Sequence, residues 1–240
     1  MTIIWHGQSC FQITATRNKG EQVSILIDPF SDEIGLKFPK LTADILLITH
    51  NHYDHNNIKA VSAPTTNSQP FLISGSGEYE IKNVSIEGIH SWHDTSEGEE
   101  QGGNTVYIIE AEDLKLCHLG DFGQKELTEE QLEKIGEVDI LMIPIGGIYT
   151  ISAKEAVKVM SQLEPKVIIP MHYQIPKLKI KLDGLDKFLK MLGIKSITPE
   201  NKLSIKKKDI SPEEVKIVVL QVPQSGTKGE MKRSFSDLKP

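Results

Sequence analysis

Four potential metal ligands stand close together directly after a short apolar segment. The segment Ile45–Ile48 has the length and unbroken hydrophobicity of a strand buried on both faces. His50, His52, Asp54 and His55 follow it. A loop leaving the end of a buried strand holds its side chains in fixed directions, and imidazole with carboxylate suits zinc, manganese or iron. The alternative is a polar surface loop, but three of the eight histidines lie here, so this spacing predicts a metal site.

The other strand and helix signals predict an α/β protein built of layers. Short apolar or β-branched segments predict strands at 2–5, 10–16, 22–27, 71–74, 84–89, 105–110, 114–119, 139–143, 167–169 and 215–222. Helices are predicted at 129–135, 152–163 and 182–192, and the first two begin with the capping boxes Thr128 with Gln131 and Ser152 with Glu155. Strands come first and then alternate with helices, which favours packed sheets with helices outside. We expect one domain over residues 1–222 and a flexible tail over 223–240.

Composition and charge argue against several classes of protein. The formal net charge of −6 disfavours a general nucleic-acid binder. The two cysteines, Cys10 and Cys117, cannot form a disulfide framework, and no Cys-x-x-Cys pair is available for zinc. The N-terminus does not have the pattern of a signal peptide, and no apolar run is long enough to cross a bilayer. We therefore expect a cytoplasmic protein with no membrane segment.

The His-x-His-x-Asp-His pattern at residues 50–55 resembles the signature motif of the metallo-β-lactamase fold superfamily. That resemblance implies four further elements, each placed after a strand: an early aspartate, a lone histidine, a Gly-Asp pair and a final histidine. They are present in the implied order as Asp28, His93, Asp121 and His172. The resemblance covers most of the chain and implies a four-layer αββα sandwich.

Within this superfamily, the segments 5–11, 118–121 and 144–147 are similar to one branch of hydrolases. The branch contains ascorbate-phosphate lactonases and phospholipase-D-like lipid hydrolases. One departure is that the branch often has Gly-His-Ser where this chain has Gly7-Gln8-Ser9. Any role of that histidine therefore does not transfer to this chain, and the role of the nearby His6 is not defined by the resemblance.

The resemblance implies a centre of two divalent metal ions. The implied ligands are three residues for each ion and one shared aspartate: His50, His52 and His93 for the first, Asp54, His55 and His172 for the second, and Asp121 between them. Two ions that share a hydroxide lower its pKa and present it as a nucleophile. Asp54 is the implied catalytic residue, which orients this nucleophile and accepts its proton. Zinc is the expected metal, and manganese or iron suits the same ligands.

Several histidines and aspartates have competing interpretations. Asp28 is expected to orient a ligand histidine rather than to bind metal directly. His118 lies in a predicted strand, and it is expected to be buried or to support the ligands. His93 competes with His90 three residues earlier, and its position in the pattern favours His93 as the ligand and His90 as a structural residue.

Residues near the predicted ligands are candidates for substrate contact. Gly146 and Gly147 lie between a strand and a helix, where backbone N–H groups bind an anion or where a tight turn needs glycine. Tyr53 and Tyr173 each neighbour a ligand, and they either contact substrate or pack. Alternating lysines at 177–181 predict a half-exposed strand with a solvated face.

Together these features predict a metal-dependent hydrolase that cleaves a lactone, ester or phosphodiester of a small molecule, with or without a phosphate group of its own. A metal-dependent nuclease is the second hypothesis, because ribonucleases of this fold use the same centre, but the acidic balance disfavours it. The third is a metal-binding or ligand-sensing protein without turnover, which the complete ligand set disfavours. The expected partner is a small-molecule substrate, and assembly as a homo-oligomer is compatible with the sequence. Neither the substrate nor the metal follows from the sequence, because the superfamily uses one site for many reactions.

Overall fold

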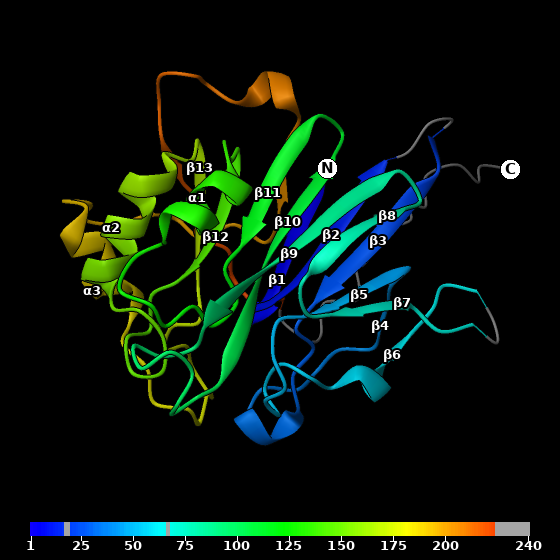
Figure 1. Cartoon of the computed structure of the whole chain (residues 1–240), viewed down its shortest axis with the longest axis horizontal. Coiled ribbons are helices and arrows are strands. Elements are labelled where there is room, and N and C mark those ends of the chain that lie inside the picture. Colours follow the sequence, from blue (N-terminus) through cyan, green and yellow to red (C-terminus); the bar gives the residue numbers. More distant parts are fainter. Residues whose placement is uncertain (17–19, 66–67, 224–240) are drawn as a thin grey trace, which may run out of the picture.

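Two β-sheets form the centre of the molecule (Figure 1). The computed structural model describes residues 1–16, 20–65 and 68–223. The first sheet has six strands in the order β14 (Leu203–Ser204), β1 (Thr2–Gly7), β2 (Cys10–Thr16), β3 (Gln22–Ile27), β5 (Ile45–Ile48) and β7 (Phe71–Ser74). The second has seven in the order β15 (Lys216–Ile217), β13 (Val167–Met171), β12 (Ile140–Pro144), β11 (Leu114–His118), β10 (Gly103–Ala111), β9 (Val84–Trp92) and β8 (Gly77–Ile81).

The strands β3 and β5 are buried on both faces. Ile25 and Ile45 belong to the main apolar core, which contains residues of both sheets. The alternate residues Leu26 and Leu46 belong to a second buried cluster on the opposite face. This burial on two sides explains why residues 45–48 form an unbroken apolar run, as the sequence predicts.

Three α-helices lie together on one side of the molecule, next to β11, β12 and β13 (Figure 1). They are α1 (Glu129–Ile135), α2 (Ala153–Leu163) and α3 (Leu185–Met191). Helix α1 connects the parallel pair β11 and β12, and α2 connects the parallel pair β12 and β13, because parallel neighbours need a crossover connection. The predicted capping boxes at the starts of α1 and α2 are both present.

The outer face of the six-stranded sheet has a different cover. Its parallel pairs β3–β5 and β5–β7 are connected by segments containing 3-10 turns at Asp32–Ile34 and Ile58–Ala60 and the two-stranded pair β4 (Leu41–Thr42) with β6 (Val61–Ser62). No α-helix lies in these connections over the part of the chain that the structure describes. The predicted α/β fold with two packed sheets is confirmed, whereas this outer layer consists of turns and short strands rather than α-helices.

Some predicted elements have other bounds. Strand β9 continues to Trp92, and β8 had no strand signal because glycine and charged residues interrupt it. The predicted strand at 177–181 is a loop. Helix α3 begins at Leu185, after the N-cap Gly184, rather than at the predicted residue 182. The last strand is short because residues after Ile217 turn to pair with Glu200.

Two predictions concern the ends and the membrane. The expected flexible tail lies, from residue 224 onward, outside the described residues. Within the described part of the chain, no helix has the length and apolar character needed to cross a bilayer.

Candidate metal centre

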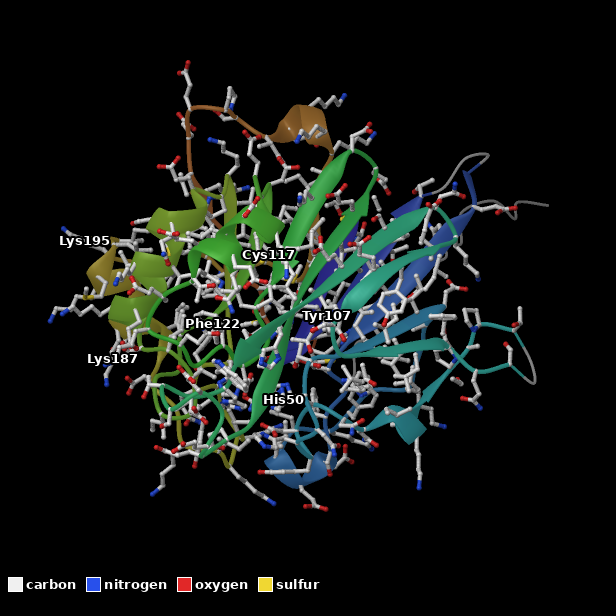
Figure 2. The ribbon with its side chains drawn as sticks, viewed as in Figure 1. His50, Tyr107, Cys117, Phe122, Lys187 and Lys195 are labelled. Atoms are coloured by element: carbon white, nitrogen blue, oxygen red, sulfur yellow. The ribbon has the colours of Figure 1, made fainter. Side chains whose placement is uncertain are left out.

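The ends of β3, β5, β9, β11 and β13 carry the predicted metal ligands and Asp28 to one edge of the molecule, and the end of β1 brings Gln8 to the same edge. Strands β3 and β5 run parallel, and so do β11 and β13 through β12. Strand β1 is antiparallel to β2, which is antiparallel to β3, so β1 and β3 run in the same direction. Strand β9 runs in the same direction as β11 for the same reason, through β10. The carboxyl ends of these strands therefore meet at the same edge. Two backbone hydrogen bonds connect the sheets there, from Thr105 N to Thr49 O (2.9 Å) and from His172 N to Gln8 O (3.1 Å). Figure 2 shows His50 at this edge, in the lower part of the view.

The predicted ligands form compact groups. Potential ligand atoms within each group all lie within 4.8 Å of one another, and the groups are His50 with His52 and His93, Asp54 with His55 and His172, and His50 with His55 and Asp121. The first two groups coincide with the two ligand sets that the resemblance implies. Oδ2 of Asp121 lies 3.2 Å from His55 Nε2, 3.4 Å from His93 Nε2 and 3.1 Å from His172 Nε2. This carboxylate therefore lies between the two sets.

The donor atoms of this cluster suit divalent metal ions. His50 Nε2 is buried and has no hydrogen-bond partner among the described residues. An unpartnered buried nitrogen costs free energy, and a bound cation would remove that cost. Imidazole and carboxylate donors together suit zinc, manganese or iron.

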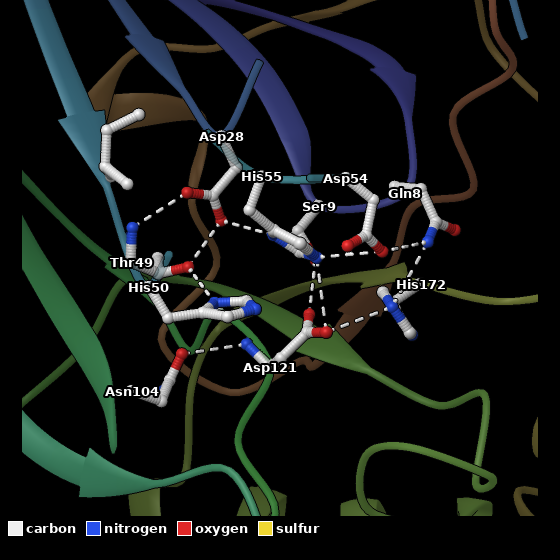
Figure 3. Close-up of polar contacts among 12 residues, drawn as sticks. Gln8, Ser9, Asp28, Thr49, His50, Asp54, His55, Asn104, Asp121 and His172 are labelled. Carbon is white, nitrogen blue, oxygen red and sulfur yellow. Dashed lines mark hydrogen bonds and ion pairs between the residues drawn. The ribbon is translucent and has the colours of Figure 1, made fainter. Parts of the chain in front are cut away.

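Asp28 determines which nitrogens of two histidines face the cluster (Figure 3). Its Oδ2 accepts from the Thr49 hydroxyl (2.7 Å) and lies 3.0 Å from His55 Nδ1. Because the single hydroxyl proton of Thr49 points to Asp28, Thr49 Oγ1 accepts from His50 Nδ1 (2.9 Å). Nδ1 of both histidines thus carries a proton, and Nε2 is the nitrogen that faces the cluster and would bind metal. Asp28 occupies the orienting position that the sequence predicted.

Charges within the cluster shift the pKa values of its members. Burial alone would lower the pKa of His55, but the carboxylates of Asp121, Asp54 and Asp28 outweigh burial and raise it well above the ordinary value. Burial likewise opposes ionisation of Asp121, yet the neighbouring His172 and His55 hold its pKa well below the usual range. Burial, followed by the neighbouring His55, lowers the pKa of His50. The Asp121 carboxylate therefore stays ionised at neutral pH.

Asp121 is held by neighbours that the sequence did not indicate. Its Oδ1 accepts from the Ser9 hydroxyl (3.0 Å), and its backbone N–H donates to Asn104 Oδ1 (3.0 Å). Gly120 precedes it with φ of +58°, and a Cβ there would lie 2.3 Å from Asn104 Oδ1. His118 accepts from Gly120 N at Nδ1 (3.1 Å), so its Nε2 donates to Ser9 O (2.9 Å). His118, which is buried, is therefore neutral. Its connection to Asp121 is indirect, through Ser9 and Gly120.

Gln8 enters the cluster where the related branch often has histidine. Its side chain is buried, and Nε2 donates to Asp54 Oδ2 (3.2 Å) and lies 3.3 Å from His172 Nε2. Its Oε1 is buried and has no hydrogen-bond partner in the part of the chain that the structure describes. The backbone is in the left-handed region, which residues other than glycine seldom adopt, at Gln8 (φ 50°), Asp28 (φ 48°) and His172 (φ 50°). Backbone strain of this kind is concentrated at functional sites.

A cavity of about 600 Å³ opens over the cluster, a size usual for small-molecule sites. Its lining consists of His52, Tyr53, Asp54, His93, Gln101, Asp121, Tyr149, His172, Lys179, Ile180 and Lys181. Tyr53 and Tyr149 are 56% and 46% exposed, so their rings stand at its mouth. Sequence patterns indicated only Tyr53 among the residues of the rim.

The other predicted substrate residues lie elsewhere. Tyr173 is buried and stacks on Trp5 with ring centroids 5.1 Å apart, so it packs in the core instead of lining the cavity. Gly147 has φ of +76°, and its own N–H donates to Ile151 O (3.2 Å) instead of facing an anion site. A Cβ on Gly146 would lie 2.1 Å from His172 O, so glycine there permits close backbone packing. Neither glycine lines the cavity.

Two further histidines are absent from the metal-ligand groups of the described chain. His90 is exposed and packs edge-on against Trp92 with centroids 4.3 Å apart. His6 is buried in β1, and burial lowers its pKa to about 4. A larger hollow of about 760 Å³ lies at the opposite end of the second sheet and has no histidine in its described lining.

Comparison with known proteins identifies the family to which the chain belongs. A family model described as a β-lactamase superfamily domain matches residues 2–172. Metal-dependent hydrolases named UPF0173 from Thermoplasma volcanium and Thermococcus onnurineus are 35% and 32% identical, over 71% and 70% of this chain and 82% of each relative. A solved structure from Thermotoga maritima, described as a candidate Zn-dependent hydrolase of the metallo-β-lactamase superfamily, is 37% identical with a TM-score of 0.71, and the match covers 91% of this chain and 97% of that one. The chain therefore belongs to the metallo-β-lactamase superfamily, and within it to the UPF0173 family of metal-dependent hydrolases.

Proposed function

We propose that the cluster binds two divalent metal ions and hydrolyses a lactone, ester or phosphodiester of a small molecule in the cavity above it. The observation that carries this proposal is the pair of three-residue ligand groups with Asp121 between them, at the base of that cavity. The proposed ligands are His50, His52 and His93 for one ion, Asp54, His55 and His172 for the other, and Asp121 for both. Zinc is the favoured metal, with manganese or iron as alternatives.

The residues of the chain divide the work of such a reaction. Two bound ions would supply a water of lowered pKa and a positive field for the oxygen on which charge develops. The Asp54 carboxylate lies at the cavity, where it orients the attacking water and accepts its proton. The Gln8 amide donates to Asp54 and so keeps the carboxylate in place. Asp28 contacts His55 directly and His50 through Thr49, and so keeps Nε2 of both histidines facing the proposed metal site.

The cavity favours a small substrate over a nucleic acid. Only two lysines line it, Lys179 and Lys181, and the chain as a whole carries a net charge of −6. A nuclease needs a longer basic surface to follow a phosphate backbone. Cytoplasmic location, homo-oligomeric assembly and a single domain over residues 1–222 remain predictions from the sequence.

Hydrolysis by protein stripped with a chelator and then reloaded tests this function. We expect the stripped protein to be inactive and zinc, manganese or iron to restore cleavage of either a generic lactone or a generic phosphodiester. Asp54→Ala should remove that activity, whereas Asp139→Asn, at the opposite end of the second sheet, should retain it. Cleavage of RNA instead would favour the nuclease. Bound metal without turnover of any of these substrates would contradict the proposal and favour a sensor.

A further inference from the structure

The loop of residues 174–183, after the last proposed ligand, is held in a defined conformation. Its ends meet through a hydrogen bond from Gln174 N to Asp183 O (2.9 Å). Inside the loop, the Gln174 side chain donates to the carbonyls of Ile175 and Leu178 and accepts from Leu182 N. Compact loops with closed ends and an internal packing of this kind frequently carry function.

Contacts outside the loop fix its position over the site. Leu178 and Leu182 are buried in the apolar cluster on the outer face of the first sheet. Lys179 N donates to Ile34 O (2.8 Å). The loop also packs closely on Gly35, where a Cβ would lie 2.2 Å from Lys177 O. These contacts hold the loop backbone in place, and the backbone in turn positions the exposed side chains of the loop.

This support presents two cations to the proposed metal centre. Lys179, Ile180 and Lys181 all line the cavity, and both lysines are exposed. Neither lysine forms an ion pair within the described parts of the chain. The carboxylates that line the same cavity are Asp54 and Asp121, which face the histidine cluster. The two lysines therefore have free charge directed at whatever enters the cavity.

We propose that this lysine rim, Lys179 and Lys181, binds an anionic group of the substrate, a phosphate or a carboxylate separate from the bond that is cleaved. The inference rests on the proposed function and names its substrate class: a small anionic ester or lactone. Two lysines that form no ion pair with a described residue, at a cavity of an acidic protein, concentrate positive charge where it attracts an anion. Tyr53 and Tyr149, on the same rim, offer ring faces and hydroxyls to the rest of the molecule.

Direct binding of stable probes tests the rim without requiring turnover. The probes are phenylphosphonate, benzoate and the neutral benzamide, titrated calorimetrically into zinc-loaded protein at low and high salt. The variant is Lys179→Ala with Lys181→Ala, and the matched control is Lys177→Ala, an exposed lysine of the same loop that does not line the cavity. Zinc content is measured in each protein, because equal content assigns a change in binding to the lysines.

We expect the double variant to bind its preferred anion roughly tenfold more weakly, with benzamide unchanged, and the loss to shrink at high salt. Lys177→Ala should stay within about twofold of the wild type. The ratio of phenylphosphonate to benzoate affinity identifies phosphate or carboxylate as the preferred group. Unchanged anion binding in the double variant, an equal loss for benzamide, or no anion binding by the wild type would overturn the inference. Charge-selective binding without hydrolysis of any ester would instead refute the proposed function and retain the lysine rim.

Discussion

Replacing Asp28 with asparagine should weaken metal binding although Asp28 itself is not a proposed ligand. Asp28 accepts hydrogen bonds from Thr49 N (2.8 Å), the Thr49 hydroxyl (2.7 Å) and His55 Nδ1 (3.0 Å). Asparagine retains the shape of the side chain and also tolerates the φ of 48° at this position. Its NH₂ group, however, faces the hydroxyl and the imidazole N–H that formerly donated to a carboxylate oxygen.

The size of the effect follows from these two lost contacts. His55 can relieve the clash by moving its proton to Nε2, but that nitrogen is then unable to bind metal. Loss of such an orienting partner weakens metal affinity by about 10- to 100-fold, which is about 1.4–2.8 kcal/mol. In the metal-free protein, poorly paired buried groups should lower the free energy of unfolding by about 2–3 kcal/mol.

Competition with a chromophoric chelator measures zinc affinity, and urea unfolding of the metal-free protein measures stability. Asp139→Asn is the matched control, because Asp139 is also largely buried, accepts from Lys115 N (3.0 Å) and lies far from the site. We expect it to lose stability but to retain zinc affinity. If Asp28→Asn bound zinc as tightly as Asp139→Asn, the assignment of tautomers through Asp28 and Thr49 would be refuted.

Three further changes test other parts of the structure. Gln8→Leu removes the amide that contacts Asp54, together with a buried oxygen that has no partner among the described residues. We expect kcat/KM to fall about tenfold or more, while stability in urea stays level or rises. Lower stability with full activity would contradict this expectation. Gly120→Ala places a Cβ 2.8 Å from Thr49 Cβ and should cost at least about 2 kcal/mol in urea unfolding; a cost near zero would show that Asp121 does not need this tight turn. His6 has a folded pKa of about 4, below its ordinary value, so the unfolded state binds more protons between the two values and metal-free stability falls as pH drops through that window. This group should contribute about 3 kcal/mol of that fall by pH 4, and His6→Gln should lose that part of the pH dependence; identical pH profiles would refute it.

Local patterns indicated only part of the site. The run 50–55 after an apolar strand, and the capping boxes that begin α1 and α2, each depend on residues close together in the chain. Asp28, His93, Asp121 and His172 are far apart in the chain, and the resemblance to the superfamily indicated them. The structure places all seven predicted ligands and Asp28 at one edge because parallel strand ends meet there.

What the sequence did not predict depends on contacts between distant segments. Asn104 contacts Asp121 from β10, the strand beside β11, and Ser9 contacts it from the other sheet. The lysines at 179 and 181 alternate with apolar residues as in a strand, but closure of the loop by Gln174 overrides that local preference. In the sequence, Tyr173 and Tyr53 each neighbour a predicted ligand, but Tyr173 stacks on the Trp5 ring in the core. A departure from the family pattern at Gln8 was the one available signal for that residue.

The central claim is that the His and Asp cluster holds the metal on which hydrolysis depends. Metal content measured by plasma mass spectrometry, on the wild type and on Asp121→Ala, tests it most directly, because Asp121 Oδ2 lies near histidines of both ligand groups. We predict about two ions per wild-type chain, as expected for a two-metal hydrolase site, and a loss of at least one ion with the activity in the variant. A wild-type protein that holds no metal after reconstitution with zinc, manganese and iron would contradict the account.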